Sequence, residues 1–258
     1  MGVVNTTPDS FSDGGLYFDS EGAVAHGLQL WEEGADIVDV GGASTRPGAE
    51  DVSESEEVDR TTGVVESLVT QGVVVSIDTF RPNVAAAAIA AGAEAVNDVT
   101  ALADPAMAQV VAESGAGVVL MHMQGEPRTM QDAPHYDDVV SEVAEFLVER
   151  AEFAESSGID PARISVDPGI GFGKSFEHNL DLLSGLDRLV EIGKPVLLGT
   201  SRKRFLGQIL GEDDPLQRDI ATSATLSLAI SQGVSVLRVH NVAMALQTAR
   251  VADAIVRA

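Results

Sequence analysis

Polar and charged side chains recur directly after short apolar runs along the whole chain, and their types are suited to binding and neutralising a ligand. In chain order they are Asn5, Ser44-Thr45-Arg46, Asp78, Asn97-Asp98, His122, Asp167, Ser201-Arg202-Lys203-Arg204, and Arg238 with His240. A single Asp or Asn at such a position is more often the N-cap of the helix that follows. Capping does not require charged groups after each of several successive apolar runs, so the series as a whole favours a binding or catalytic site.

The basic residues are concentrated at these same positions, although the protein as a whole is strongly acidic. The chain has 16 Lys and Arg against 40 Asp and Glu, for a formal net charge of −24. Half of the basic residues fall in the loops that follow the apolar runs. These are Arg46, Arg81, Arg128, Lys174, Arg202, Lys203, Arg204 and Arg238. Local cations in an acidic protein predict an anionic ligand.

The elements that position these residues follow from the spacing of the apolar residues. Eight short runs rich in β-branched residues, with little alternation, are typical of parallel strands buried on both faces. They are Val3-Val4, Ile37–Val40, Val73–Ile77, Ala95-Val96, Val118–Leu120, Ile164–Val166, Val196–Leu198 and Val234–Val239. Helical spacing between the runs predicts four stripes that face the core, and Trp31 is expected to be buried in one of them. The stripes are Val24-Leu28-Trp31, Val58-Val65-Leu68-Val69, Val139-Val143-Phe146-Leu147 and Ile220-Ala224-Leu228.

Seven glycines fall just before a predicted strand, where a left-handed cap would end the preceding helix. They are Gly34, Gly72, Gly92, Gly115, Gly158, Gly193 and Gly233. Strand and helix alternate eight times without a linker, which predicts one α/β domain over residues 1–258, a (β/α)8 TIM barrel with its active site at the C-terminal ends of the strands. An open doubly wound sheet is the alternative, since periodicity does not reveal closure. Such a sheet normally has a glycine-rich turn after its first strand, where this chain has Asn5-Thr6-Thr7-Pro8.

Composition narrows the partners and the location. The net charge of −24 argues against nucleic acid and against an anionic membrane surface. The chain has no cysteine, which excludes disulfides, thiolate metal sites and a cysteine nucleophile. No apolar run reaches membrane length, so we expect a cytoplasmic protein. The acidic, lysine-poor composition predicts a protein that works in concentrated salt, with an ordinary acidic cytosolic enzyme as the alternative.

Motifs over almost the whole chain resemble those of the dihydropteroate synthase family. The opening NTTPDSFSDGG and the later DVGGASTRPGA are similar to two signatures of that family. Six further motifs occur in the family's order at the predicted loop positions. They are SIDT, VNDV, MHMQGEPRTMQ, DPGIGFGK, GTSRKRF and RVHN. The resemblance implies a TIM-barrel transferase of folate biosynthesis that condenses 6-hydroxymethyl-7,8-dihydropterin pyrophosphate with p-aminobenzoate, releases pyrophosphate and forms 7,8-dihydropteroate. It also implies Mg²⁺ as cofactor, a homodimer, and inhibition by sulfonamides, which resemble p-aminobenzoate.

The same resemblance implies a role for individual residues, carried over motif by motif. It implies Asp78, Asp167 and Lys203 as catalytic residues. The pterin is expected on Asp78, Asn97, Met121, Asp167 and Lys203, and the pyrophosphate on Asn5, Arg238 and His240, with Asn5 as a ligand of Mg²⁺. p-Aminobenzoate is expected on Thr45, Arg46, Pro47, Phe172 and Ser201, and Asp13 is expected to lie in a mobile loop.

The chain departs from the family pattern at a few positions. Ala43 stands where the family commonly has Glu, and Thr6 where it commonly has Val. Only Met1 and Gly2 precede the first predicted strand, which leaves open that Met1 is an internal methionine of a longer protein. Two alternative functions also stay open. One is a pterin-dependent methyltransferase, which gives no reason for STRPGA or SRKRF, and the other is a pterin-binding paralogue without catalysis.

Overall fold

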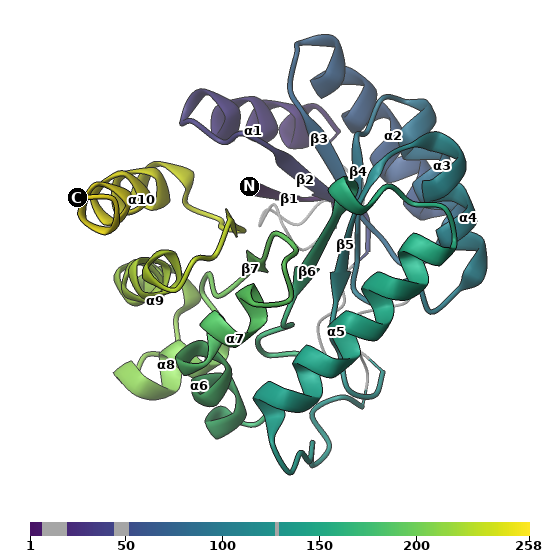
Figure 1. The fold of residues 1–258 in the computed structure, drawn as a ribbon. Helices are drawn as coiled ribbons and strands as arrows, with labels where there is room; N and C mark the ends of the chain where they lie inside the picture. The colour runs from purple at the N-terminus through teal and green to yellow at the C-terminus, as the bar shows by residue number, and fades with distance from the viewer. Residues whose placement is uncertain (7–19, 44–51, 127–128) are drawn as a thin grey trace.

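The residues that the computed structural model describes, 1–6, 20–43, 52–126 and 129–258, form a barrel of eight parallel strands surrounded by helices (Figure 1). The strands are β1 (Gly2–Asn5), β2 (Val38–Gly41), β3 (Val75–Asp78), β4 (Ala95–Asp98), β5 (Gly117–Met121), β6 (Ile164–Asp167), β7 (Leu197–Leu198) and β8 (Val236–Leu237). Each of the eight predicted apolar runs overlaps one of these strands, so the prediction of eight strands is confirmed.

Hydrogen bonds at two seams close the sheet on itself. Strands β1 to β6 pair in chain order, and β7 pairs with β8. At the first seam the amide of Val166 donates to the carbonyl oxygen of Pro195 at 2.9 Å. At the second, the amide of Val3 donates to the carbonyl oxygen of Val239 at 3.1 Å. The predicted barrel is therefore confirmed, and the open sheet is excluded.

The helices lie on the outside of the barrel, each between two strands or after the last (Figure 1). They are α1 (Ser20–Glu32), α2 (Glu54–Thr70), α3 (Pro82–Ala90), α4 (Pro105–Ser114), α5 (Val139–Ser156), α6 (Phe176–Ser184), α7 (Leu186–Val190), α8 (Arg204–Leu210), α9 (Asp219–Ser231) and α10 (Val242–Val256). Short side chains cap several of them. Asp138, for example, accepts from the amide of Ser141 at the start of α5, which satisfies one of the amides that have no partner inside the helix.

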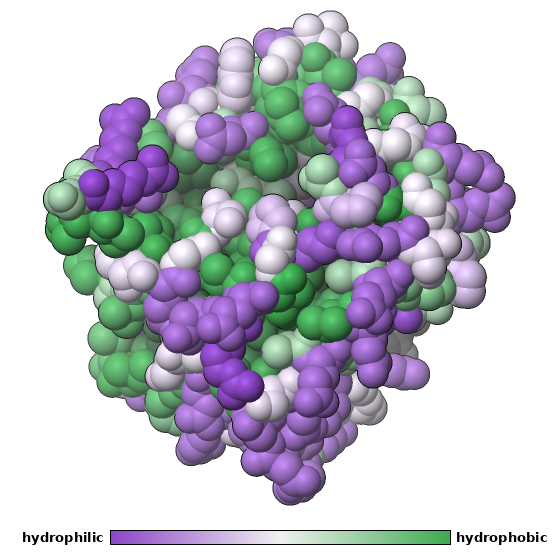
Figure 2. Space-filling view, in the orientation of Figure 1, coloured by the Kyte–Doolittle hydropathy of each residue, from purple (hydrophilic) through white to green (hydrophobic). Residues whose placement is uncertain are grey.

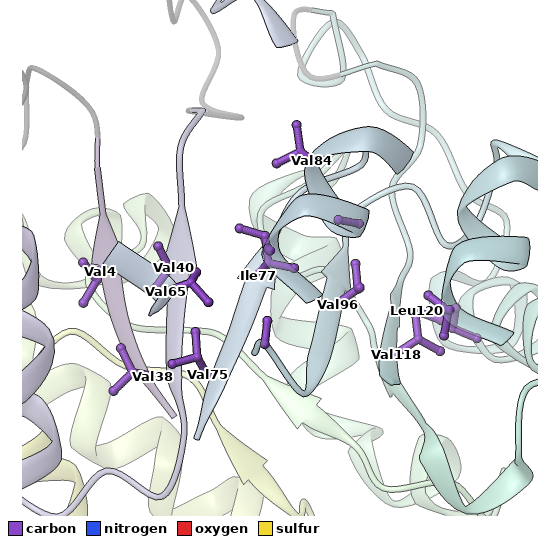
Figure 3. Close-up of a cluster of buried hydrophobic side chains, with 14 of the residues drawn as sticks. Val4, Val38, Val40, Val65, Val75, Ile77, Val84, Val96, Val118 and Leu120 are labelled. Carbon is purple, nitrogen blue, oxygen red and sulfur yellow. The ribbon is translucent and has the colours of Figure 1, made fainter. Parts of the chain in front are cut away.

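Apolar residues on the outward faces of the strands form the main core against the helices. Val38 and Val40 in β2, and Val75 and Ile77 in β3, are fully buried. They pack with helix residues such as Val65 of α2 (Figure 3). Successive residues of a strand point to opposite faces, so the residues between them point into the barrel.

Some of those inward residues are polar, although they lie within runs that are otherwise apolar. Asp39 of β2 and Ser76 of β3 are fully buried between apolar neighbours. At the C-terminal ends of the strands the inward positions hold Asp78, Asn97 and Asp167. We call this end of the barrel the mouth.

Two details of the helix prediction are wrong, and one is confirmed. The stripe of Ile220, Ala224 and Leu228 on α9 faces outward, with Ile220 86% and Leu228 62% exposed. Trp31 is 42% exposed, because the face of α1 that packs on the barrel is formed by Ala23, Gly27 and Leu30, and Trp31 lies to one side of it. Helical spacing identifies an apolar face but does not say what the face packs against.

All seven predicted glycine caps have a positive φ, from 72° at Gly115 to 107° at Gly92.

Candidate active site at the mouth of the barrel

The side chain of Arg238 connects two carboxylates at the mouth. It follows β8, and its Nε donates to Oδ2 of Asp39 at 2.6 Å. Its Nη2 donates to Oδ2 of Asp78 at 2.7 Å. Burial alone would lower the pKa of Arg238, but the charges of Asp39 and Asp78 outweigh it and raise that pKa. The guanidinium is therefore a fixed positive charge at the mouth.

Asn97 is held beside this pair with one polar atom left over. Its Nδ2 donates to Oδ2 of Asp39 at 3.1 Å. Its Oδ1 is the one buried side-chain nitrogen or oxygen without a hydrogen-bond partner in the described part of the chain. A buried acceptor without a partner is unfavourable by roughly 1–3 kcal/mol. Such an atom at the mouth of a barrel points to a ligand that supplies a donor.

Asp167 and Lys203 form the second half of the mouth. Oδ1 of Asp167 accepts from the amide of Gly169 at 2.7 Å. The ammonium group of Lys203 donates to the carbonyl oxygen of Ile170 and lies 5.0 Å from the centre of the Phe172 ring. Lys203 and Arg238 both act on the charge of Asp167. Four of the residues predicted to hold the pterin (Asp78, Asn97, Asp167 and Lys203) thus lie around one mouth.

Burial shifts the pKa values of these groups toward neutrality. It raises the pKa of Asp78 from 3.8 to about 7, with Arg238 opposing the shift and Asp39 adding to it. It also raises the pKa of Asp167, against the charge of Lys203. Burial lowers the pKa of Lys203 from 10.5 to about 8, against the charge of Asp167. Perturbed acids and a perturbed base at one mouth are typical of an active site.

The loop after β6 approaches the end of β5 so closely that it requires glycine. A Cβ on Gly169 would lie 1.9 Å from the carbonyl oxygen of His122, and a Cβ on Gly173 would lie 2.3 Å from that of Gln124. Both glycines have a positive φ, of 65° and 61°. This close approach explains the glycine-rich DPGIGFGK segment, which carries Phe172 to the mouth.

Lys174 anchors the same loop from below. Its side chain is 2% exposed, and its Nζ lies 2.9 Å from Nδ1 of His122 and 2.9 Å from the carbonyl oxygen of Phe172. Burial lowers the pKa of Lys174 to about 7 and that of His122 to about 3. A neutral His122 accepts a hydrogen bond from this lysine, so the pair supports the loop.

Two further loop cations, which were expected to serve an anionic ligand, form ion pairs with acidic side chains instead. Arg81 pairs with Glu57 at 2.7 Å, and Arg202 pairs with Asp219 at 2.7 Å. The expectation that these loop cations serve a ligand is therefore too broad. Arg238 and Lys203 remain at the mouth, while Arg46 and Arg128 lie outside the described residues.

The remaining predicted site residues lie at the same end of the barrel where the structure describes them. Ser201 follows β7 and His240 follows β8, and Oγ of Ser201 lies 2.9 Å from Nδ1 of His240. Asn5 ends β1, and Met121 ends β5 in register with Asp167. Four predicted residues lie outside the described residues, and their roles stay predictions. They are Asp13, Thr45, Arg46 and Pro47.

Asp39 is the residue that sequence reasoning missed. It is fully buried and accepts from Ser76, Asn97 and Arg238. A signal for it was present in the sequence, because a carboxylate within the run Ile37–Val40 must have partners if that run is a buried strand.

The chain is similar to known proteins over almost its whole length. A family model described as pterin binding enzyme matches residues 1–240. The dihydropteroate synthase of Mycobacterium leprae is 47% identical, over 98% of this chain and 92% of that protein. No helix in the described part of the chain is long and apolar enough to cross a membrane.

Solved structures give the same result. The Xanthomonas albilineans dihydropteroate synthase with 4-aminobenzoic acid is 52% identical, with a TM-score of 0.93, over 98% of this chain and 91% of that one. The Yersinia pestis dihydropteroate synthase, solved with a sulfonamide drug complex, is 40% identical, with a TM-score of 0.94, over 100% of this chain and 94% of that one. The chain belongs to the pterin binding enzyme family and, within it, to the dihydropteroate synthases of folate biosynthesis.

Proposed function

We propose that the mouth of the barrel holds the dihydropterin by its polar edge and catalyses its condensation with p-aminobenzoate by dissociative substitution. The observation that carries the proposal is the grouping of Asp167, Asn97 and Lys203 around one mouth. A carboxylate accepts two parallel hydrogen bonds from an amino group and the ring N–H beside it. Asp167 takes that edge, Oδ1 of Asn97 accepts from another ring donor, and Lys203 donates to the pterin carbonyl.

The chemistry needs no protein nucleophile. The bond between the pterin methylene carbon and the diphosphate oxygen breaks, and its electron pair leaves with the oxygen. Positive charge develops on the methylene, where carboxylates such as Asp78 and Asp167 stabilise it more than they stabilise the neutral ground state. The amine nitrogen of p-aminobenzoate then bonds to the carbon, and its surplus proton passes to solvent.

The diphosphate is proposed to lie on the side of the mouth formed by Arg238 and His240, with Asn5. A guanidinium has five N–H groups, and in the described residues two of those of Arg238 face Asp39 and Asp78. The others are suited to phosphate oxygens. Positive charge that is fixed before the diphosphate leaves lowers the barrier, since no reorganisation is needed as the negative charge grows.

Mg²⁺ is proposed as the cofactor, bound mainly through the diphosphate. In the described residues no group of three or more His, Cys, Asp or Glu could hold a metal. The donor set therefore fits a cation that keeps several waters, takes phosphate oxygens, and uses the side-chain oxygen of Asn5 as one protein ligand. When bound, Mg²⁺ would neutralise charge on the leaving group. Titration of the protein with Mg²⁺, with and without pyrophosphate, tests this: binding that is equally tight without pyrophosphate would contradict it.

p-Aminobenzoate is proposed to pack its ring on Phe172 and to place its carboxylate near Ser201. Phe172 lies under the Lys203 ammonium group, and Ser201 lies beside His240, so both adjoin the proposed pterin and diphosphate positions. The predicted contributions of Thr45, Arg46 and Pro47 belong to the same proposal. Sulfonamides should inhibit competitively with p-aminobenzoate, and a noncompetitive pattern would count against this arrangement.

Pyrophosphate release from the pterin diphosphate, p-aminobenzoate and Mg²⁺ tests the reaction directly, at low and at high salt. The Asp167→Asn variant should lose most of its turnover. Asp160→Asn is the matched control, because Asp160 caps the short helix that precedes β6, at the opposite end of the same strand. Absence of turnover by the unaltered protein at both salt concentrations would refute the proposal.

A homodimer is proposed from the outward face of α9 and α10, which lie side by side (Figure 1). Five large apolar residues of these helices are more than half exposed: Ile220 at 86%, Leu228 at 62%, Val251 at 63%, Ile255 at 71% and Val256 at 51%. Figure 2 shows hydrophobic residues gathered over these two helices. An apolar surface of this kind is suited to a second copy of the chain, because a symmetric dimer brings the same surface of both copies together.

Light scattering after size exclusion tests the dimer. Ile220→Asp should give a monomer, whereas Val148→Asp, on the exposed side of α5, should not change the mass. A monomeric unaltered protein would contradict the proposal.

A cytoplasmic location also stays a prediction, which fractionation of cells tests.

A further inference from the structure

Three side chains donate hydrogen bonds to the buried carboxylate of Asp39. Two of them lie in neighbouring parts of the sheet, and the third follows the last strand. Ser76 of β3 donates to Oδ1 at 2.5 Å, while Asn97 of β4 and Arg238 after β8 donate to Oδ2 at 3.1 and 2.6 Å. Asp39 lies two residues before the end of β2, below the mouth, and is fully buried. A carboxylate at this depth does not reach the proposed ligand position directly, but it contacts two residues that do.

An ionised carboxylate can only accept hydrogen bonds, and this constrains the amide of Asn97. The amide nitrogen must face Asp39, because the alternative orientation would place two acceptor oxygens against each other. The amide oxygen is thereby turned away from Asp39, and it is the oxygen that has no partner in the described part of the chain. The position of Asp39 thus decides which end of the Asn97 amide the ligand meets.

We propose that Asp39 is a positioning residue that fixes the orientation of the Asn97 amide, so that the mouth presents an acceptor and selects a heterocycle with a hydrogen-bond donor at that edge. This inference rests on the proposed function, since it assigns the ligand of Asn97 to the pterin. Through Nε, Asp39 also holds the guanidinium of Arg238, whose Nη2 faces Asp78. One buried carboxylate therefore orders an acceptor and a cation at the mouth.

The test is binding of a pterin that lacks the diphosphate, measured by calorimetry, because the diphosphate contacts of Arg238 then do not enter. Asp39→Leu removes both acceptors, keeps the branched shape of the side chain and frees the Asn97 amide to rotate. Asp39→Asn keeps an acceptor toward Asn97 and Arg238 and turns its own amide nitrogen toward Ser76. We expect Asp39→Leu to weaken pterin binding by roughly tenfold or more, as for one lost hydrogen bond at a buried site. Asp39→Asn should stay within about threefold of the unaltered protein.

A double-mutant cycle separates positioning from general loss of structure. In an Asn97→Ala background, Asp39→Leu should weaken pterin binding far less than it does alone, because its effect passes through Asn97. Asp98→Asn is the control: Asp98 is also fully buried, in the same strand as Asn97, but it accepts from Thr100 and Leu102 rather than from residues at the mouth. An equal effect of Asp39→Leu in both backgrounds would overturn the proposal.

Asn97→Asp gives a second test that does not depend on the folding of the Asp39 variants. A carboxyl at position 97 meets Asp39, with Asp78 and Arg238 as the other charged neighbours. Protonated, it donates to Asp39 and still presents an oxygen to the ligand, so its pterin affinity relative to the unaltered protein should rise as pH falls. A ratio that stays constant from about pH 5 to about pH 9, a window wider than the usual carboxyl range, would overturn the proposal. If the unaltered protein binds no pterin, the proposed function fails as well, whereas equal binding by Asp39→Leu removes this inference alone.

Discussion

The two faces of the same strands differ sharply in chemistry. In β2 and β3 the outward residues Val38, Val40, Val75 and Ile77 are all fully buried against helices. The inward residues of these strands include Asp39, Ser76 and Asp78, which are joined through hydrogen bonds to Asn97 and Arg238. One peptide unit separates a residue that stabilises the fold from one that serves the site. The strand alternation thus lets one short segment meet two requirements.

Stability and activity are thus assigned to opposite faces of the same strands. Burial of an apolar side chain stabilises the folded state, while burial of Asp78 raises its pKa and therefore opposes folding near neutral pH. At the mouth, therefore, the ionised carboxylate of Asp78 is unfavourable for folding, although it serves the proposed site.

Asp167→Asn should have the largest effect, on activity and not on folding. The variant keeps the volume but loses the charge that accepts the pterin edge, so kcat/KM should fall by roughly 100- to 1000-fold, the range for one preorganised electrostatic group. Steady-state pyrophosphate release measures it. A comparable loss of thermal stability would show that the inward face also maintains the fold.

Ile77→Ala should have the reverse effect. Ile77 is fully buried on the outward face of β3, next to Asp78 in the chain. The cavity should lower the free energy of unfolding by roughly 2 to 5 kcal/mol, measured by urea denaturation. The kcat/KM of the folded fraction should change little. A large loss of kcat/KM in fully folded protein would contradict the separation of the two faces.

Much of the fold could be predicted from the sequence, because the outward face is regular. Apolar runs gave all eight strands, and glycines such as Gly92 and Gly115 have the positive φ of a helix end. The closed barrel was expected from the eightfold repeat and from the family resemblance. Apolar periodicity alone did not show closure, because closure depends on hydrogen bonds between residues far apart in the chain, such as Val3 and Val239. The outward stripe with Ile220 was misassigned for the same reason, since a pattern on one helix does not reveal its neighbour.

The candidate site was predicted by residue type and resemblance, but its connections were not. Asp78, Asn97, Asp167 and Lys203 lie around one mouth as expected. The partners of Asp39 and of Lys174 come from strands and loops distant in sequence, so no local pattern contains them. Arg202 was counted as a cation for a ligand, whereas its pairing with Asp219 is visible only in three dimensions.

Asp78→Asn should alter the pH dependence of stability. In the folded protein the pKa of Asp78 is about 7 against an ordinary 3.8, so the folded state binds more protons than the unfolded state between these values. The contribution of Asp78 to stability is therefore present at low pH and is lost as pH rises through about 7. The variant lacks this titration, so its stability relative to the unaltered protein should be greater at pH 8 than at pH 5 in thermal melts.

Asp160→Asn is the control for this measurement, because Asp160 is exposed on the opposite end of the barrel. Its stability difference from the unaltered protein should not follow the same course between the two pH values. An Asp78→Asn difference that is independent of pH would show that Asp78 does not titrate in this window.

Concentrated KCl should have the smallest effect and should act on the outer surface rather than on the mouth. The net charge is −24, so the exposed acidic side chains repel one another. Salt screens the interactions between exposed charges more than those between buried charges. The melting temperature should rise modestly between dilute and molar KCl, while binding of a diphosphate-free pterin should change less. No rise in melting temperature would favour an ordinary acidic enzyme over one adapted to salt.

A crystal structure with a bound pterin would show whether Asp167 and Asn97 hold the ligand together at the mouth. We predict that the amino group and adjacent ring N–H of the pterin lie on the carboxylate of Asp167, and that another ring donor lies within hydrogen-bond distance of Oδ1 of Asn97. A pterin bound away from these two side chains, with Oδ1 of Asn97 still lacking a partner, would show that the mouth does not bind the ligand in this way.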